Sequence, residues 1–217
     1  HIDTNLGNIL IKYIDNYLKQ GAIDAEIRIG KRNGAYCASS HKITTHIMLN
    51  HDDTLYSFLT FAHEMGHAIH SELSQKQSVL YSDYSLSLAE TASTLFENIA
   101  FESTLKDLDK KSQIISLHNK ISDSISTIFR QVACFRLELD LHNAIRAKGY
   151  VNTSEIQQIH NRNMSSYLGS AVKFTEDDGL GYVSWPHLRY FFYVYTYAYG
   201  LLVSKVLLQK YKADKSF

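Results

Sequence analysis

The sequence of 217 residues contains a single proline and only two cysteines, and it carries no excess of charge of either sign. Because proline interrupts helices, its near absence permits long ones. Cys37 and Cys134 are far apart and form no disulfide framework, so we expect a reducing compartment, the cytoplasm. The 22 basic residues balance the 22 acidic ones, which argues against nucleic acid or an anionic membrane as a partner. No apolar run is long enough to span a bilayer.

The length is sufficient to bury one sizeable hydrophobic core, and we expect a single catalytic domain over residues 1–217. There is no repeat and no low-complexity linker. The chain starts at His1 without a methionine or a signal-like apolar stretch, and it ends just after a strongly patterned helix. We therefore expect it to be a piece of a longer protein.

Apolar residues recur at helical spacing along most of the chain, and a short zone near the start has β character. The predicted fold class is mainly α with a small β-sheet. Strands are predicted at 23–29, 35–38 and 43–49. Helices are predicted over 5–19, from a cap at Asp52 or Asp53 to about Leu73, from a cap at Ser85 or Ser87 to about Leu108, over 109–148 as one helix or two closed by Gly149, over 153–168, and from about His187 to Tyr211. Residues 174–183 are predicted to form a loop.

The segment His63-Glu64-Met65-Gly66-His67 matches the pattern HExxH. On a helix, residues four apart lie on one face, and two imidazoles placed there can bind one zinc ion at ~2.0–2.1 Å. Glu64 lies one position round from His63, where it reaches a water on the metal and serves as the candidate general base. The alternative is a pair of ordinary surface histidines.

Several residues are candidates for the third ligand. His70 shares the helix face of the motif, but it lies seven residues after His63, or ~10 Å along the axis, which is too far for one ion. Glu72 and Glu102 are possible, but no pattern supports them. Glu90 follows a loop that can return the chain, and small residues surround it, so it is preferred.

Gly66 supports this choice, because a glycine inside a helix lets another backbone approach closely. Two histidines and Glu90 leave the fourth tetrahedral position for water, which is the arrangement of a catalytic zinc site, with one zinc per chain. Glu97, two turns further along the same helix as Glu90, is a candidate to hydrogen-bond a ligand imidazole. Its alternative is a solvated carboxylate.

Four ordered segments resemble the thimet oligopeptidase/oligoendopeptidase F family of zinc peptidases, and oligoendopeptidase F most closely. They are KRNGAY at 31–36, AHEMGHAIHS at 62–71, LAETAST at 88–94 and PHLRYFFYVYTYAYG at 186–200. The stretch FRLE at 135–138 is similar to an intervening family segment. The resemblance covers residues 31 to 200.

The resemblance implies a mostly helical fold with a deep substrate channel, and cleavage inside short oligopeptides. It implies that zinc is bound by His63, His67 and Glu90, with Glu64 as the base. Family members are much longer, with an N-terminal helical region that forms the other channel wall, so this chain resembles the catalytic core alone.

The same resemblance implies that His187 and a following tyrosine stabilise the oxyanion. We favour Tyr193 and Tyr195, with Tyr190 and Tyr197 behind them. For each of these tyrosines the alternative is core packing.

The strand at Gly34, Ala35 and Tyr36 is predicted to offer its backbone edge to an extended substrate. Two rival functions stay open at this stage. One is a fragment that binds zinc and peptide without turnover, and the other is a zinc hydrolase of another specificity, such as an aminopeptidase.

Overall fold

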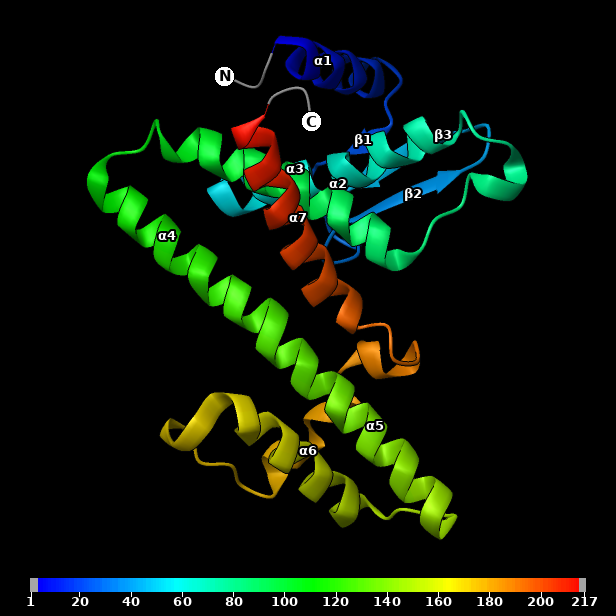
Figure 1. The fold of residues 1–217 in the computed structure, drawn as a ribbon, viewed down its shortest axis with the longest axis vertical. Helices are drawn as coiled ribbons and strands as arrows, with labels where there is room; N and C mark the ends of the chain where they lie inside the picture. Colours follow the sequence, from blue (N-terminus) through cyan, green and yellow to red (C-terminus); the bar gives the residue numbers. More distant parts are fainter. Residues whose placement is uncertain (1–3, 215–217) are drawn as a thin grey trace. The chain divides into compact units, whose positions relative to one another are not determined.

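The structure is a computed structural model that describes residues 4–214, and the chain divides into two compact units. The first contains the residues up to Ser116 together with those from Gly200 onward, and the second runs from Leu117 to Tyr199. Helix α7 (Tyr195–Ala213) starts in the second unit and continues in the first (Figure 1). Each unit is described by itself below.

The first unit combines helices with one small sheet, and the predicted fold class is confirmed. Its elements are α1 (Thr4–Lys19), β1 (Ile23–Asp24), β2 (Tyr36–Ser40), β3 (Ile43–Met48), α2 (Leu55–Ser74), a 3-10 turn (Val79–Tyr81), α3 (Leu86–Leu105), the start of α4 (Lys110–Ile125) and most of α7. The sheet order is β1-β3-β2, with β1 parallel and β2 antiparallel to β3. Strand β2 is therefore an edge strand.

The first predicted strand is wrong in length, because β1 ends at Asp24 instead of residue 29. The cause is Lys31, whose side chain is only 4% exposed and whose ammonium donates to the carbonyl oxygens of Asp24, Glu26 and Leu49 at 2.7–2.9 Å. The chain bends around this cation instead of continuing the ladder. Arg28 and Lys31 together hold the pKa of the Asp24 carboxyl well below its usual range.

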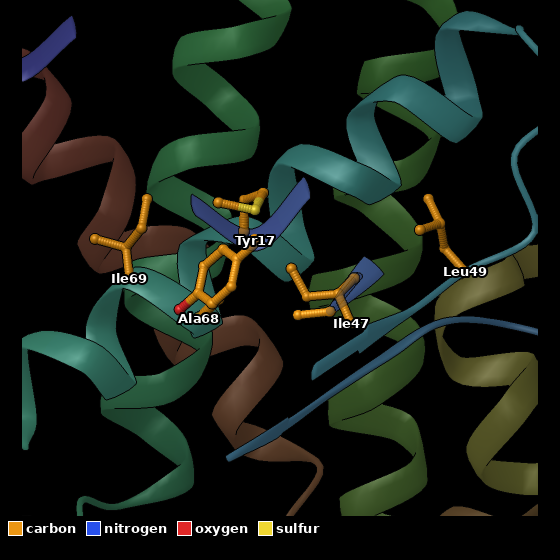
Figure 2. Close-up of a cluster of buried hydrophobic side chains, with 7 residues drawn as sticks. Tyr17, Ile47, Leu49, Ala68 and Ile69 are labelled. Carbon is orange, nitrogen blue, oxygen red and sulfur yellow. The ribbon is translucent and has the colours of Figure 1, made fainter. Parts of the chain in front are cut away.

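The core of the first unit lies between α1, the sheet and one face of α2 (Figure 2). Tyr17 from α1 and Ile47 from β3 pack with Met65, Ala68 and Ile69 of α2. Burying each of the larger apolar side chains is worth ~1.5–3 kcal/mol. This apolar face fixes the rotation of α2, and therefore the direction in which its histidines point.

The start of α2 differs from the prediction. Thr54 is the N-cap and accepts a hydrogen bond from the Ser57 amide, whereas Asp52 binds the amide and hydroxyl of Thr54 and Asp53 has a positive φ of 59°. The cap of α3 is Ser85, one of the two predicted residues, and α3 ends at Leu105.

Helices α2 and α3 meet at Gly66. A β-carbon added there would lie 2.6 Å from the Ser93 α-carbon and 3.0 Å from the Ala92 carbonyl oxygen. No side chain fits in that space. The glycine thus permits the close backbone approach that the sequence suggested.

The second unit is built from helices and short 3-10 segments. Its elements are the end of α4, a wider π-helical turn (Ser126–Arg130), α5 (Gln131–Lys148), α6 (Thr153–Leu168) and 3-10 segments at Gly169–Ala171, Asp177–Val183 and Pro186–Arg189. Gly149 closes α5 in the left-handed conformation, as predicted. The predicted loop at 174–183 is partly wrong, because most of it forms a 3-10 helix.

The last helix also differs from the prediction, because α7 starts at Tyr195 and not near His187. Phe191 and Phe192 have positive φ values of 49° and 59°, which an α-helix does not contain. Each costs about 1–2 kcal/mol for a residue other than glycine. Glu138, only 3% exposed, stabilises the turn by accepting a 2.8 Å hydrogen bond from the Phe192 amide.

Among residues 4–214, none of the helices is both long and apolar enough to cross a membrane.

Gly66→Ala tests the helix contact. Alanine is favoured in a helix interior by ~1 kcal/mol, so without a steric conflict this substitution would stabilise the protein. We expect the collision with α3 to dominate and to lower the free energy of unfolding by about 1–3 kcal/mol, measured by urea denaturation. Thr60→Ala, on the same helix and half-buried, is the control. A more stable Gly66→Ala protein would show that the helices are not in close contact.

Candidate metal centre

The two histidines of the HExxH motif and Glu90 lie together in the first unit. His63 and His67 are on α2 and Glu90 is on α3. One ligand atom from each lies within 4.8 Å of the others, and the His63 Nε2 and Glu90 Oε2 atoms are 3.6 Å apart. The imidazoles meet edge to face, with ring centroids 5.0 Å apart.

Glu97 fixes the orientation of one imidazole. Its Oε2 lies 3.1 Å from His63 Nδ1. Because a carboxylate only accepts, Nδ1 carries the hydrogen and donates it, which leaves the lone pair of Nε2 directed at the side of Glu90. A metal-binding imidazole needs this tautomer.

Two glycines bring the neighbouring helices against α3. Gly66 of α2 lies against Ser93, and a β-carbon at Gly200 of α7 would lie 2.7 Å from the Glu90 β-carbon and 2.8 Å from its carbonyl carbon. The backbone that carries Glu90 is therefore confined from both sides. Gly200 was not among the predicted site residues, although a glycine within an apolar helix was an available signal.

Glu64 is buried, with 7% of its surface exposed. Burial raises the pKa of its carboxyl to about 7, with the charge of His63 opposing the shift and that of Glu90 adding to it. A carboxyl of this kind can hold or release a proton near neutral pH.

The two imidazoles differ in their electrostatics. Burial lowers the pKa of His67 to about 3, and the charges of His63 and His70 act in the same direction, so His67 is neutral at pH 7. Burial also acts against the charged form of His63, but the carboxylates around it, above all Glu97, outweigh burial and raise its pKa.

The donor set is of the kind that zinc binds. Two imidazole nitrogens and a carboxylate oxygen are typical ligands, and bonds of ~2.0–2.1 Å at tetrahedral angles place ligand atoms ~3.3 Å from one another. The 3.6 Å separation of His63 and Glu90 is close to that value. The residues present therefore fit a zinc ion.

The other candidates for the third ligand make contacts outside this cluster. The ring of His70 stacks on Tyr84 at 3.9 Å. The carboxylate of Glu72 accepts hydrogen bonds from Tyr17 and Thr45, and Glu102 forms an ion pair with Lys212.

In the second unit, His187 lies in a cluster of tyrosines. The Tyr193 ring stacks on it at 5.7 Å and 12°, and the Tyr197 ring lies 5.8 Å away, with its hydroxyl 3.2 Å from that of Tyr193. Tyr190 contacts Tyr193 edge to face. Tyr195 lies apart, 51% exposed and against Phe135.

His187 itself is half-buried. Burial lowers its pKa, and the charge of Arg130 acts in the same direction. Its Nδ1 is buried and has no hydrogen-bond partner among the described residues.

The predicted substrate strand lies at the start of β2. Gly34 and Ala35 precede the strand and Tyr36 opens it. The next residue, Cys37, has its thiol pKa raised to about 12 by burial and by the charges of Glu64 and Glu72. Edge strand β2 packs against α2, the helix that carries His63 and His67.

Comparison with known proteins gives matches over nearly the whole chain. Residues 9–217 match the family described as Peptidase family M3. The chromosomal oligoendopeptidase F of Lactococcus lactis subsp. cremoris is 36% identical over 191 residues, which cover 87% of this chain and 32% of that protein. The chain spans about a third of the length of the curated relatives that it matches.

Solved structures share the fold. A crystal structure of a peptidase from Chlamydophila abortus has a TM-score of 0.69 and 32% identity, covering 92% of this chain and 33% of its own. PZ peptidase A, solved with an inhibitor, has a TM-score of 0.76 at 17% identity and covers 94% of this chain and 37% of its own. The family match, the sequence relatives and the shared fold agree with the resemblance to oligoendopeptidase F. This chain belongs to peptidase family M3.

Proposed function

We propose that this chain is the catalytic core of a zinc endopeptidase that hydrolyses internal bonds of short peptides. The observation that supports it most is the convergence of His63, His67 and Glu90, whose ligand atoms lie within 4.8 Å of one another, with Glu64 beside them. Three protein ligands leave a coordination position open, as in catalytic zinc sites.

In this proposal each residue has a defined task. His63, His67 and Glu90 hold one zinc ion, and Glu97 keeps His63 in the required tautomer. When bound, zinc supplies a Lewis acid that acidifies water and polarises the peptide carbonyl. Glu64 accepts the proton of the attacking water and returns it to the leaving amine, and its burial keeps bulk water away from the transfer.

Oxyanion stabilisation is assigned in this proposal to His187 and a tyrosine, as the resemblance to oligoendopeptidase F implies. His187 and a tyrosine hydroxyl donate to the developing charge, and one such donor is typically worth ~3–4 kcal/mol. We place Tyr193 ahead of Tyr195 for this role, because Tyr193 stacks on His187 whereas Tyr195 lies against Phe135.

The substrate is proposed to be an extended oligopeptide. The outer edge of β2, starting at Gly34, Ala35 and Tyr36, offers backbone groups that bind the peptide main chain and do not select for its side chains. Both cysteines are free, which agrees with a reducing compartment, and the cytoplasm remains our proposed location.

A second candidate function follows from the length of the relatives. Because the chain spans about a third of them, the other wall of a substrate channel would have to come from elsewhere. A zinc-binding fragment that holds peptide without turnover is the alternative.

Hydrolysis of a short, internally quenched peptide tests the main proposal. The zinc-loaded chain is expected to cleave it, and Glu64→Gln is expected to reduce kcat/KM by about 10²–10⁴-fold, the usual contribution of a general base. Glu102→Gln, which changes a carboxylate outside the site, serves as the control. Cleavage by Glu64→Gln at the parent rate would disprove the assignment. If zinc binds one to one and no variant cleaves, the alternative function holds.

Glu97→Ala tests how the metal is held. Removing the acceptor of the His63 Nδ1 hydrogen frees the imidazole to rotate or to change tautomer, and such losses typically weaken metal affinity by about 10–100-fold. The affinity is measured by competition with a chelating fluorophore, with Glu102→Ala as the matched variant on the same helix. An unchanged zinc affinity in Glu97→Ala would show that Glu97 does not help to hold the metal.

A further inference from the structure

A polar cavity of about 410 Å³ lies in the first unit next to the metal centre. It is formed by the end of β2, the end of α2 and the loop that leads into α3. The lining residues used below are Ser39, Ser71, Asp83, Tyr84, Leu86 and Ala89.

The position of the cavity relative to the metal ligands follows from the helices. Ser71 lies one helical turn beyond His67, ~6 Å along the axis, and Ala89 directly precedes Glu90. An extended peptide advances ~3.3–3.6 Å per residue. A peptide with its scissile bond at the metal centre therefore brings a side chain to the cavity within about three residues of that bond.

The wall of the cavity is made of hydroxyl groups held in place. The Ser39 hydroxyl donates to that of Ser71 at 2.9 Å, and Ser71 shares a 2.5 Å hydrogen bond with the Tyr84 hydroxyl. The Tyr84 ring is stacked on His70, which fixes the aromatic wall. These oxygens can accept hydrogen bonds from a ligand with several donors.

The permanently charged side chain of the cavity is a carboxylate. Asp83 is the one carboxylate among its lining residues, which include one histidine, His41, and no lysine or arginine. The Asp83 Oδ1 atom accepts a hydrogen bond from the Tyr84 amide at 2.9 Å, and no basic side chain pairs with it among the described residues. Leu86, 54% exposed, adds an apolar surface to the lining.

We propose that this cavity is a specificity subsite that takes a lysine or arginine side chain of the peptide. The aliphatic stem lies along Leu86, and the cationic head faces Asp83 and the hydroxyl oxygens. A glutamate side chain is disfavoured there, because its charge repels Asp83 and the cavity contains no lysine or arginine. The subsite rests on the proposed peptidase function and adds a preference that backbone recognition by β2 cannot provide.

Matched peptides test the proposal. The zinc-loaded chain is given internally quenched peptides that differ only in having lysine, norleucine or glutamate at one position, scanned over the three residues on each side of the cleaved bond. At one position lysine is expected to exceed norleucine in kcat/KM by roughly fivefold, and glutamate to fall below both. Asp83→Asn is expected to abolish the advantage of lysine, whereas Asp53→Asn, which changes an exposed carboxylate outside the cavity, retains it.

Peptide binding separates this inference from the proposed function. The zinc-loaded Glu64→Gln chain is titrated against fluorescently labelled versions of the same peptides, and the same order is expected in their dissociation constants. If nothing is cleaved but lysine still strengthens binding in an Asp83-dependent manner, the subsite proposal is supported and the proposed peptidase activity of this chain is not. If no peptide binds, if lysine gives no advantage, or if the advantage survives Asp83→Asn, the subsite is wrong.

Discussion

Helices α2 and α3 meet where Gly66 has no side chain, and the candidate metal centre depends on this contact. The imidazoles come from one helix and the carboxylate from the other, so their separation is set by how closely the two backbones approach. A β-carbon at Gly66 would lie 2.6 Å from Ser93, and the 3.6 Å distance between His63 and Glu90 would not survive a displacement of α3. The same approach brings Glu97 within hydrogen-bonding distance of His63.

Lys31 plays a comparable part for the predicted substrate edge. A buried ammonium is costly unless its donors are satisfied, and here they are satisfied by the backbone carbonyls of Asp24, Glu26 and Leu49. These contacts tie the end of β1 to the end of β3 and direct the chain into Gly34 and β2. The KRNGAY segment is thus a structural support as well as part of the predicted substrate edge.

Local patterns predicted much of this structure. The spacing of His63 and His67, the cap at Ser85 and the left-handed Gly149 each depend on neighbours in sequence, and each was predictable. The start of α7 was not predictable, because the turn before it at Phe191 and Phe192 is held by Glu138, which lies more than fifty residues earlier. For the same reason the sequence could not rank Tyr193 above Tyr195, since the rotation of each ring depends on where α7 begins. Gly200 was missed because its role is visible only when α7 lies against Glu90.

The packing of Gly200 against Glu90 has a consequence for the order in which the site is assembled during synthesis. The chain of α3 ends at Leu105 and that of α7 starts at Tyr195, so the ribosome completes α2 and α3 well before it reaches α7. A nascent chain that ends before Gly200 already contains His63, His67 and Glu90. The side of the Glu90 backbone that Gly200 covers is still exposed in that chain. The arrangement of His63, His67 and Glu90 described here therefore depends on α7 being translated and packed against Glu90.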